Sequence, residues 1–377
     1  MIPAVAHAAY RAGGSTLKTQ LQAAFALCVA LAALLASPSP SQARIRTYYI
    51  AADEVTWNYA PSGRDLIAQK PLPPLAPLQL GWSYHKAIYR EYLDASFRQL
   101  KSRAPEDAYL GILGPVIHAE VGDTVVVVFR NNARFPLTVH AHGMLYTKSS
   151  EGAPYQDGVS AWNKRGDSVL RGRTFTYTWK VPDRAGPGPG DGSSVVWMYH
   201  SHQDEVSDVN SGPIGPIVVT AKGMAKPDGS PKDVDREIFA MFAQFDESSS
   251  RYLAANIGDP RINPRHVKPG GDFATSDDNM WTINGFSYGN MPVPSMRVGQ
   301  HVRWYLLSTM SDFDFHAPHW HGQTVVIGGM RTDLAQLGPM AMTVADMTPD
   351  DPGTWLFHCH VNIHLAGGME ARYQVRP

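Results

Sequence analysis

Residues 354–369 have the sequence TWLFHCHVNIHLAGGM. The apolar run Trp355 to Phe357 predicts a buried strand. Successive side chains of a strand point to opposite faces, so His358 and His360 share one side while Cys359 points to the other. One short segment is therefore placed to supply ligands to two metal centres.

On the side of Cys359, the loop that follows returns His364 and then Met369. A thiolate, two imidazoles and a weakly bound thioether are the ligands of a blue-copper electron-transfer site, so a second histidine must come from elsewhere. In the stretch HAPHWHG, residues 316–322, the last two histidines are spaced to share a face, and His316 is out of phase with them. We therefore predict a type 1 copper site made of His316, Cys359, His364 and Met369.

Eight of the fifteen histidines occur in four His-x-His pairs, a spacing that puts two imidazoles on one face of a strand. One such pair is weak support for a metal site, but four pairs in one chain favour it over chance. The pairs are His140 with His142, His200 with His202, His319 with His321, and His358 with His360. Eight imidazoles are what a three-copper cluster uses.

With these four pairs in this order, ending in His-Cys-His-x3-His-x4-Met, the chain resembles the multicopper oxidases. The resemblance is closer still to the ceruloplasmin and hephaestin branch, and it covers nearly the whole chain beyond the first 43 residues. It rests on the segments YYIAADE (48–54), WNYAPS (57–62), YREY (89–92), GILGPVI (111–117) and HSHQDEV (200–206). Members of that branch have six cupredoxin domains, whereas this chain has room for two.

The resemblance also implies how the cluster ligands are divided. The first histidines of two pairs, His140 and His319, would hold the type 2 copper. The type 3 pair would be held by His142, His200, His202, His321, His358 and His360. Together with the type 1 site this makes four copper ions per functional unit.

Two catalytic residues are predicted. Cys359 would join the two centres, because its thiolate binds the blue copper and its chain neighbours bind the cluster. Asp157 falls where the family's cluster-side carboxylate lies, which makes it the candidate proton donor for oxygen reduction. The alternative for Asp157 is an ordinary residue of an Asp-Gly turn.

Composition favours an all-β chain without a nucleic-acid partner. Lys and Arg total 33 against 34 for Asp and Glu, so no net charge draws the chain to nucleic acid. Frequent Gly and Pro among short Val, Thr and aromatic runs are typical of all-β proteins. We expect two Greek-key β-sandwich domains, which the resemblance makes cupredoxin-like.

A polar linker is predicted to divide the chain. The first domain takes residues 44–222, the linker 223–236 and the second domain 237–377. Strands are expected in the first domain over residues 112–117, 124–129, 174–179 and 195–199. Ser201 stands there in the place that Cys359 holds in the second domain, so the first domain should have no blue site.

Residues 1–43 are predicted to be a signal peptide. Arg11 and Lys18 precede the apolar run 21–36, and residues 37–43 end in the small-x-small pattern that a signal peptidase cuts. The alternative, an N-terminal membrane anchor, needs a longer apolar run. We expect an exported protein, periplasmic or secreted, with no membrane association after cleavage and Cys359 as its one remaining cysteine.

Substrate choice is where the resemblance and the residues differ. Ferroxidases of the ceruloplasmin type hold ferrous iron with carboxylates and a histidine, but Ile363 stands where one such Asp precedes the second blue-site histidine. The family's histidine falls on Trp281 and a family acid on Ser276, although Asp277 and Asp278 are close by. We therefore expect a laccase-like oxidase that couples oxidation of phenols or aromatic amines to reduction of dioxygen to water.

There are three alternatives to this function. One is a ferroxidase or other metal-ion oxidase of the ceruloplasmin type, and another is a copper-binding protein without oxidase activity. The third is a two-domain copper nitrite reductase, but that enzyme has its blue site in the first domain and a single three-histidine copper.

The division of ligands predicts the assembly. Each domain carries two histidine pairs, half of a cluster, and the related six-domain chains close into a ring. Three copies of a two-domain chain could close the same ring head to tail, as a homotrimer with clusters between subunits. The alternative is a monomer that pairs its own two domains. Four more histidines lie beyond the predicted signal peptide and are predicted to be structural or surface residues: His85, His118, His266 and His301.

Overall fold

The computed structural model describes residues 1, 42–267, 278–309 and 315–377. Residues 1–42 and 43–377 form separate units by their internal contacts. The predicted signal peptide falls almost wholly outside the described residues and stays a prediction. Within the described part of the chain, no helix has both the length and the apolar character needed to cross a membrane.

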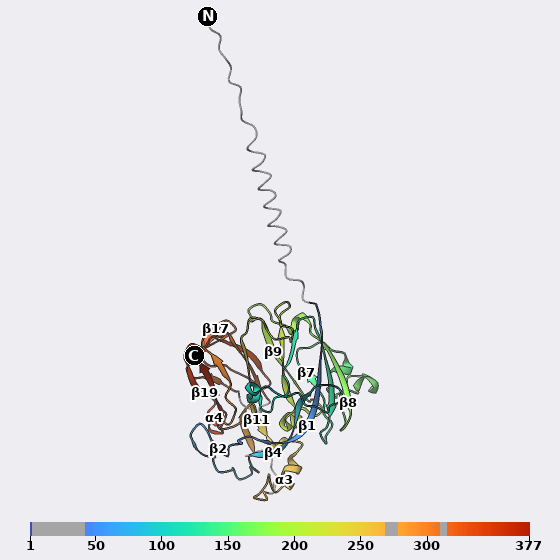
Figure 1. Cartoon of the computed structure of the whole chain (residues 1–377). Coiled ribbons are helices and arrows are strands. Elements are labelled where there is room, and N and C mark those ends of the chain that lie inside the picture. The colour runs from blue at the N-terminus through green and yellow to red at the C-terminus, as the bar shows by residue number, and fades with distance from the viewer. Residues whose placement is uncertain (2–41, 268–277, 310–314) are drawn as a thin grey trace. The chain divides into compact units, whose positions relative to one another are not determined.

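The first half of the second unit is a sandwich of two four-stranded sheets (Figure 1). One sheet has the order β4-β1-β6-β8, with β4 (Ser83–Tyr92), β1 (Ile45–Asn58), β6 (Thr124–Asn131) and β8 (Thr174–Lys180). The other has the order β5-β10-β9-β7, with β5 (Ile117–Glu120), β10 (Ile214–Thr220), β9 (Ser194–His200) and β7 (His140–Ala141). Alternate residues of β6 are buried, and Val125 and Val127 share a core with Ile217 and Val219 of β10. The core therefore lies between the two sheets.

The second half repeats this architecture. A six-stranded sheet has the order β12-β11-β14-β18-β16-β17, with β12 (Asn279–Ile283), β11 (Arg236–Asp246), β14 (Val302–Ser308), β18 (Met342–Met347), β16 (Val325–Ile327) and β17 (Met330–Thr332). A four-stranded sheet has the order β13-β20-β19-β15, with β13 (Ser295–Arg297), β20 (Glu370–Arg376), β19 (Gly353–Cys359) and β15 (Pro318–Trp320). In each half, the two strands that carry the His-x-His pairs are neighbours at one edge of a four-stranded sheet.

Helices are few and short in the described residues. They are α2 (Glu205–Ser211), α3 (Leu253–Gly258) and α4 (Asn362–Ala366). The 3-10 turns are η1 (Pro105–Leu110), η2 (Lys148–Ser150), η3 (Ala161–Lys164), η4 (Asp183–Ala185) and η5 (Glu247–Ser249), and β2 (Arg64–Asp65) pairs with β3 (Lys70–Pro71). The all-β fold expected from composition is confirmed.

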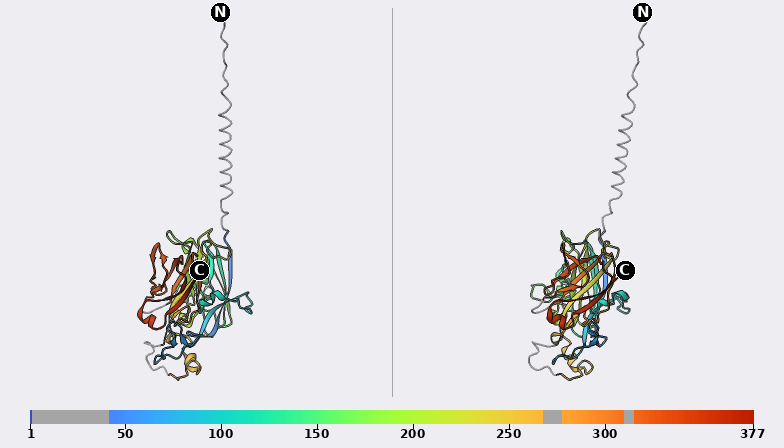
Figure 2. Two further views of the ribbon diagram at one scale, coloured as in Figure 1. Left: turned by 60° about the vertical axis from the view of Figure 1, so that its left-hand side comes forward. Right: turned by 90° about the vertical axis from the view of Figure 1, so that its left-hand side faces the viewer.

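The two sandwiches share one buried cluster and lie as neighbours in both views of Figure 2. Leu110 and Ile112 of the first half pack in the same cluster as Phe242 and Ile283 of the second. Asn284, with a φ of 53°, donates from its side-chain amide to the backbone oxygens of residues 109 and 239, both at 2.9 Å. An amide with buried partners on both sides fixes how the halves meet.

The strand predicted over residues 112–117 is wrong except for its last residue. β5 begins at Ile117, because Pro115 has no N–H to donate to a ladder and Gly111 has a φ of 53°. The segment bonds elsewhere, since the backbone N–H of Ile112 donates to Asn284 and that of Gly114 donates to Ile214. The other three predicted strands of the first half are confirmed as parts of β6, β8 and β9.

Candidate metal centres

The structure brings His316, Cys359 and His364 together, with their ligand atoms within 4.8 Å of one another. Cys359 is the last residue of β19, His364 lies in the next helix, α4, and His316 lies two residues before β15. All three side chains are buried, and Cys359 Sγ lies 3.5 Å from His364 Nδ1. Three of the four residues predicted for the type 1 site therefore form one cluster.

His316 shows that this cluster suits a soft metal ion. Its ring is fully buried, yet neither ring nitrogen has a hydrogen-bond partner among the described residues. A buried polar group left in this state costs about 1–3 kcal/mol. Burial lowers the pKa of His316 to about 3, so at neutral pH the ring is uncharged and has a lone pair to donate. Imidazole beside a thiol is a donor set that fits copper.

Met369, the predicted fourth ligand, is held beside this cluster by its backbone. Its oxygen accepts from the N–H of Cys359 at 3.1 Å, and its own N–H donates to the oxygen of His364 at 2.9 Å. The Met369 side chain is fully buried. The sequence spacing from Cys359 to Met369 thus corresponds to a closed loop around α4.

On the opposite face of β19, the histidines of the second half form another cluster. His319 of β15 lies directly across from His358 of β19 in the antiparallel ladder. His319, His321 and His358 have ligand atoms within 4.8 Å of one another, and the rings of His360 and His319 are 4.8 Å apart. His321 Nε2 lies 3.1 Å from His358 Nε2. Cys359 therefore separates two groups of histidines, as the alternation along the strand predicts.

The first half holds an equivalent group of four histidines. His140 of β7 lies directly across from His200 of β9, in the same register as the pair in the second half. His142 Nε2 lies 3.0 Å from His200 Nε2, and the rings of His140 and His202 are 5.1 Å apart. Burial lowers the pKa of His142 to about 4 and that of His200 to about 3, so both rings are neutral at pH 7.

The two groups also have matching hydrogen bonds that hold their rings in place. Nδ1 of His140 lies 2.8 Å from the backbone oxygen of Glu151, and Nδ1 of His319 lies 2.9 Å from that of Asp333. Nδ1 of His200 and Nδ1 of His358 each lie 3.0 Å from the backbone oxygen of the following residue. A carbonyl partner fixes Nδ1 as the protonated nitrogen, which leaves Nε2 to bind a metal ion.

Each group lies within its own sandwich. Ring contacts join the four histidines of the first half to one another and those of the second half likewise, and among the described residues no such contact joins the two groups. A cavity of about 480 Å³ opens at His319 and His321 and is also lined by Asp333 and Asp350. The single chain therefore presents two half-sites.

Ser201 replaces the thiol in the first half, as the sequence shows, and its hydroxyl is hydrogen-bonded. Its Oγ donates to Asp208 Oδ2 at 2.6 Å, and Asp208 accepts from Arg251 Nε at 2.5 Å. Asp208 is fully buried. Where the second half has a thiol beside imidazoles, the first half thus has a hydroxyl bonded to a carboxylate that a guanidinium also contacts.

Asp157 contacts lysines. Its carboxylate lies 2.6 Å from Lys164 Nζ and 3.1 Å from Lys148 Nζ, and it accepts from the backbone N–H of Val159. The hydrogen bond from Lys164 is the main reason that its pKa lies below the ordinary value. A carboxyl held ionised in a turn is a poor acid, so these contacts suit the turn alternative.

Glu205, for which no role was predicted, lies against two of the histidines. Its Oε2 is 3.2 Å from His202 Nε2 and its Oε1 is 3.8 Å from His200 Nε2. It is the first residue of α2 and is partly exposed. Its position three residues after His202 is the signal that could have identified it.

Three of the remaining histidines contact carboxylates outside both groups. The Nε2 atoms of His85, His118 and His301 each lie 3.1 Å from a carboxylate, of Asp259, Glu237 and Asp346 respectively. His266 is exposed. These positions agree with the structural or surface roles predicted for them.

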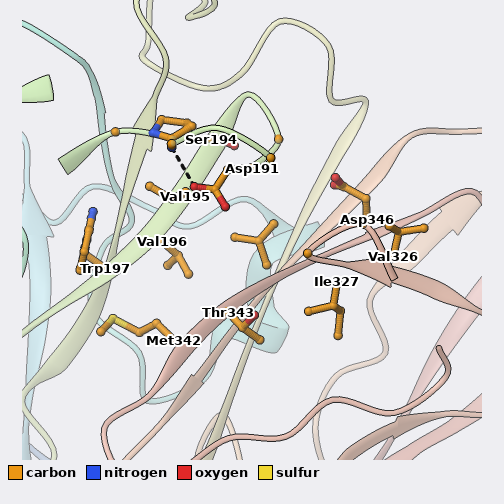
Figure 3. Close-up of a pocket in the computed structure, with 18 of the residues that line it drawn as sticks. Asp191, Ser194, Val195, Val196, Trp197, Val326, Ile327, Met342, Thr343 and Asp346 are labelled. Carbon is orange, nitrogen blue, oxygen red and sulfur yellow. Dashed lines mark hydrogen bonds between the residues drawn. The ribbon is translucent and has the colours of Figure 1, made fainter. Parts of the chain in front are cut away.

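A larger cavity, of about 790 Å³, lies away from the histidine groups (Figure 3). Trp197 and Val196 of β9 line one side, and Ile327 and Met342 of the second half line the other. Asp191 and Gly188 also line the cavity, and the Asp191 carboxylate accepts a hydrogen bond from the backbone N–H of Gly188 at 2.8 Å. None of the predicted site residues lines this cavity.

Comparisons with known proteins agree with this geometry. Two family models, both described as multicopper oxidase, match residues 110–223 and 264–377. The chain is 38% identical to ferroxidase HEPHL1 of Mus musculus over 88% of this chain and 29% of that protein. It is 38% identical to hephaestin of Rattus norvegicus, over 89% and 30%, and 39% identical to ceruloplasmin of Homo sapiens, over 88% and 32%. The chain spans about a third of the length of these relatives.

Solved structures support the fold. A blue copper oxidase from Nitrosomonas europaea superposes with a TM-score of 0.55 at 20% identity, covering 89% of this chain and 86% of that one. A second multicopper oxidase gives 0.56 at 19% identity, with coverage of 88% and 89%. The two matched segments each contain two of the four histidine pairs, and together with the sandwich fold they show that this chain belongs to the multicopper oxidase family.

Proposed function

We propose that this chain couples one-electron oxidation of a reductant to the four-electron reduction of dioxygen to water. The observation that carries the proposal is the arrangement on β19, where Cys359 contacts one ligand cluster and its neighbour His358 belongs to another. Copper bound at these residues would supply one-electron redox chemistry on one side of the strand and oxygen binding on the other. The protein's part is a short covalent route between the two.

The ligand assignment is part of this proposal. His316, Cys359, His364 and Met369 would hold a type 1 copper, since all four are buried around one loop. His140 and His319 would hold the type 2 copper. His142, His200, His202, His321, His358 and His360 would hold the type 3 pair. The matching registers and carbonyl partners of the two histidine groups support an equal division between the halves.

We propose a homotrimer as the working assembly. Each chain carries two half-sites in separate sandwiches, and a full cluster needs one of each. Head-to-tail contact between the first half of one subunit and the second half of its neighbour would join them, and such contacts close into a ring. The cavity at His319 and His321 leaves room for the partner half-site.

Two carboxyls are candidates for the proton donor. Asp157 is the candidate that the resemblance implies, but its contacts to Lys148 and Lys164 hold it ionised. Glu205 lies against His202 and is free of lysine contacts in the ion pairs of the described residues. Glu205 is therefore the candidate we favour.

Ferrous iron is the substrate that we propose first. One relative at 38% identity is named a ferroxidase, and the ceruloplasmin branch is the one the sequence resembles most. This choice replaces the laccase-like expectation, which becomes the second candidate. The two carboxylates near a possible iron site are Asp277 and Asp278. Asp277 lies outside the described residues, as does Ser276, which stands where the family has an acid. Asp278 is buried and accepts a hydrogen bond from the Tyr84 hydroxyl at 2.5 Å.

A phenol or aromatic amine remains the second candidate because of two residues beside His364. Trp281 stacks on its ring, with centroids 4.2 Å apart and planes inclined by 24°. Ile363 is 59% exposed. These apolar side chains suit a flat organic donor.

Oxygen uptake by the copper-loaded protein, offered ferrous iron, cuprous copper and a substituted phenol in parallel, tests the proposal. The highest specificity constant is expected for ferrous iron. A higher constant for the phenol would select the second candidate. Full copper content without oxygen uptake from any donor would leave a copper-binding protein and refute the oxidase.

A further inference from the structure

The residues proposed for the type 1 site have no direct access to solvent. His316, Cys359 and His364 are each 0% exposed. An external donor must therefore pass its electron through some other side chain or through the backbone. The rings packed against the two histidines are the first places to look for this route.

Only one such ring reaches the surface in the described part of the chain. Phe242 packs against His316, with centroids 6.0 Å apart, and is itself 0% exposed. Trp281 stacks on His364 and is partly exposed. The indole thus lies between solvent and the buried imidazole, at van der Waals distance from the imidazole.

The position of Trp281 is fixed by several contacts of its own. It lies in β12, across from Gln244 of β11, and its backbone oxygen accepts from Ser287 Oγ at 2.7 Å. Gly367 has a φ of −79°, which any residue can adopt, but a Cβ there would collide with the indole. Glycine at this position is explained by the space that the indole takes.

From these contacts we propose that Trp281 is the residue through which donors pass electrons to His364. The proposal rests on the proposed oxidase function and deepens it. A donor in contact with the indole would lose one electron, a metal ion held by Cys359 and His364 would gain it, and Trp281 would end unchanged. No bond forms or breaks, so one-electron donors that can contact an apolar ring would be accepted.

The first test uses the metal-free protein and requires no activity. Mercuric ion is soft, binds thiolates, and quenches nearby indoles. Its addition should quench less fluorescence in Trp281→Phe than in the wild type. Trp82→Phe is the matched control, because Trp82 packs on Tyr288 rather than on His364. Equal quenching in all three proteins would overturn the stack on which the proposal stands.

The second test measures single-turnover reduction of the blue absorption by ferrocyanide without oxygen. Trp281→Ala should keep the absorption and be reduced about tenfold more slowly, equivalent to about 1.4 kcal/mol in activation free energy. Trp281→Phe should be intermediate, and Trp82→Phe should match the wild type. Reduction of Trp281→Ala at the wild-type rate or faster would show that the indole only covers His364, and would overturn the proposal.

Gly367→Ala keeps all side chains of the cluster and displaces only the indole, so it serves if Trp281→Ala does not fold. Slower reduction with unchanged copper content supports the route, and an unchanged rate refutes it.

The outcomes separate the two proposals. A wild-type protein that takes up copper but never turns blue refutes the type 1 site, whereas a blue wild type with insensitive variants refutes only the role of Trp281.

Discussion

The backbone N–H of Ala317 donates a hydrogen bond to Cys359 Sγ, at 3.3 Å. The first half has the same bond, from the N–H of Thr138 to Ser201 Oγ at 3.0 Å. Both donors stand two residues before the first histidine of a pair, so this part of the backbone is equivalent in the two halves. At the bonded position itself, the difference between the halves is the side chain, a thiol in one and a hydroxyl in the other.

Cys359→Ser should abolish the blue colour and the oxidase activity together, because Cys359 is the one thiol placed in the proposed type 1 site. His140→Ala is the matched variant, since it changes only a residue of the other centre. It should keep the colour and lose oxygen reduction. Absorption spectra and oxygen uptake check both, and a blue Cys359→Ser protein would show that the type 1 assignment is wrong.

Coexpression of two inactive variants tests the shared clusters. His142→Ala damages only the first half-site and His321→Ala only the second, so each homotrimer should be inactive. Random mixed trimers should recover about one quarter of the wild-type activity, because one cluster in four pairs two intact halves. If each cluster formed within one chain, the mixture would stay inactive. Light scattering should also give three chains per particle.

Glu205→Gln and Asp157→Asn separate the two candidate proton donors. Loss of an acid in contact with the cluster should lower kcat by about a hundredfold. We expect that loss for Glu205→Gln, whose carboxylate lies 3.2 Å from His202, and a near-normal rate for Asp157→Asn. Copper content must match the wild type in both. The reverse result would restore Asp157 to the role that the resemblance implies.

Asp278 should make the protein less stable as pH rises from about 4 to about 7. Burial, followed by the negative charge of nearby Glu247, raises its pKa from 3.8 to about 7. Between these values the folded state holds a proton that the unfolded state has lost, so the free energy of unfolding falls with rising pH. The upper limit of this effect is about 4 kcal/mol. Asp278→Asn cannot titrate, so urea unfolding at several pH values should show a flatter profile.

Ile363→Asp should raise the specificity constant for ferrous iron. Ile363 is 59% exposed and directly precedes His364, so a carboxylate there would offer an oxygen ligand to a hard cation beside the point of electron uptake. Ile363→Asn, which has no charge, is the control and should have a smaller effect. No gain with Ile363→Asp would mean that iron is oxidised elsewhere or without inner-sphere binding.

The sequence was most informative where alternation along a strand sets the geometry. The opposite directions of Cys359 and its flanking histidines, and the out-of-phase position of His316, could be predicted because side chains of a strand alternate. The segment 112–117 was misassigned, since its apolar run looks like a strand and its bonding to Asn284 comes from tertiary structure. The lysines around Asp157 and the closeness of Glu205 to His202 could not be predicted either, because loops set both.

The hydrogen-bonded group of Ser201, Asp208 and Arg251 in the first half has an evolutionary consequence. The residues there with the same kind of backbone hydrogen bonds as His316 and Met369 are Leu137 and Pro213, and Asp208 contacts Ser201 as His364 contacts Cys359. Restoring a thiol by Ser201→Cys would therefore recover one ligand of four and take a hydroxyl donor from buried Asp208, at a cost of about 1–3 kcal/mol. The single step Ser201→Cys back toward two identical halves is thus destabilising and brings no new chemistry, which keeps the two halves different.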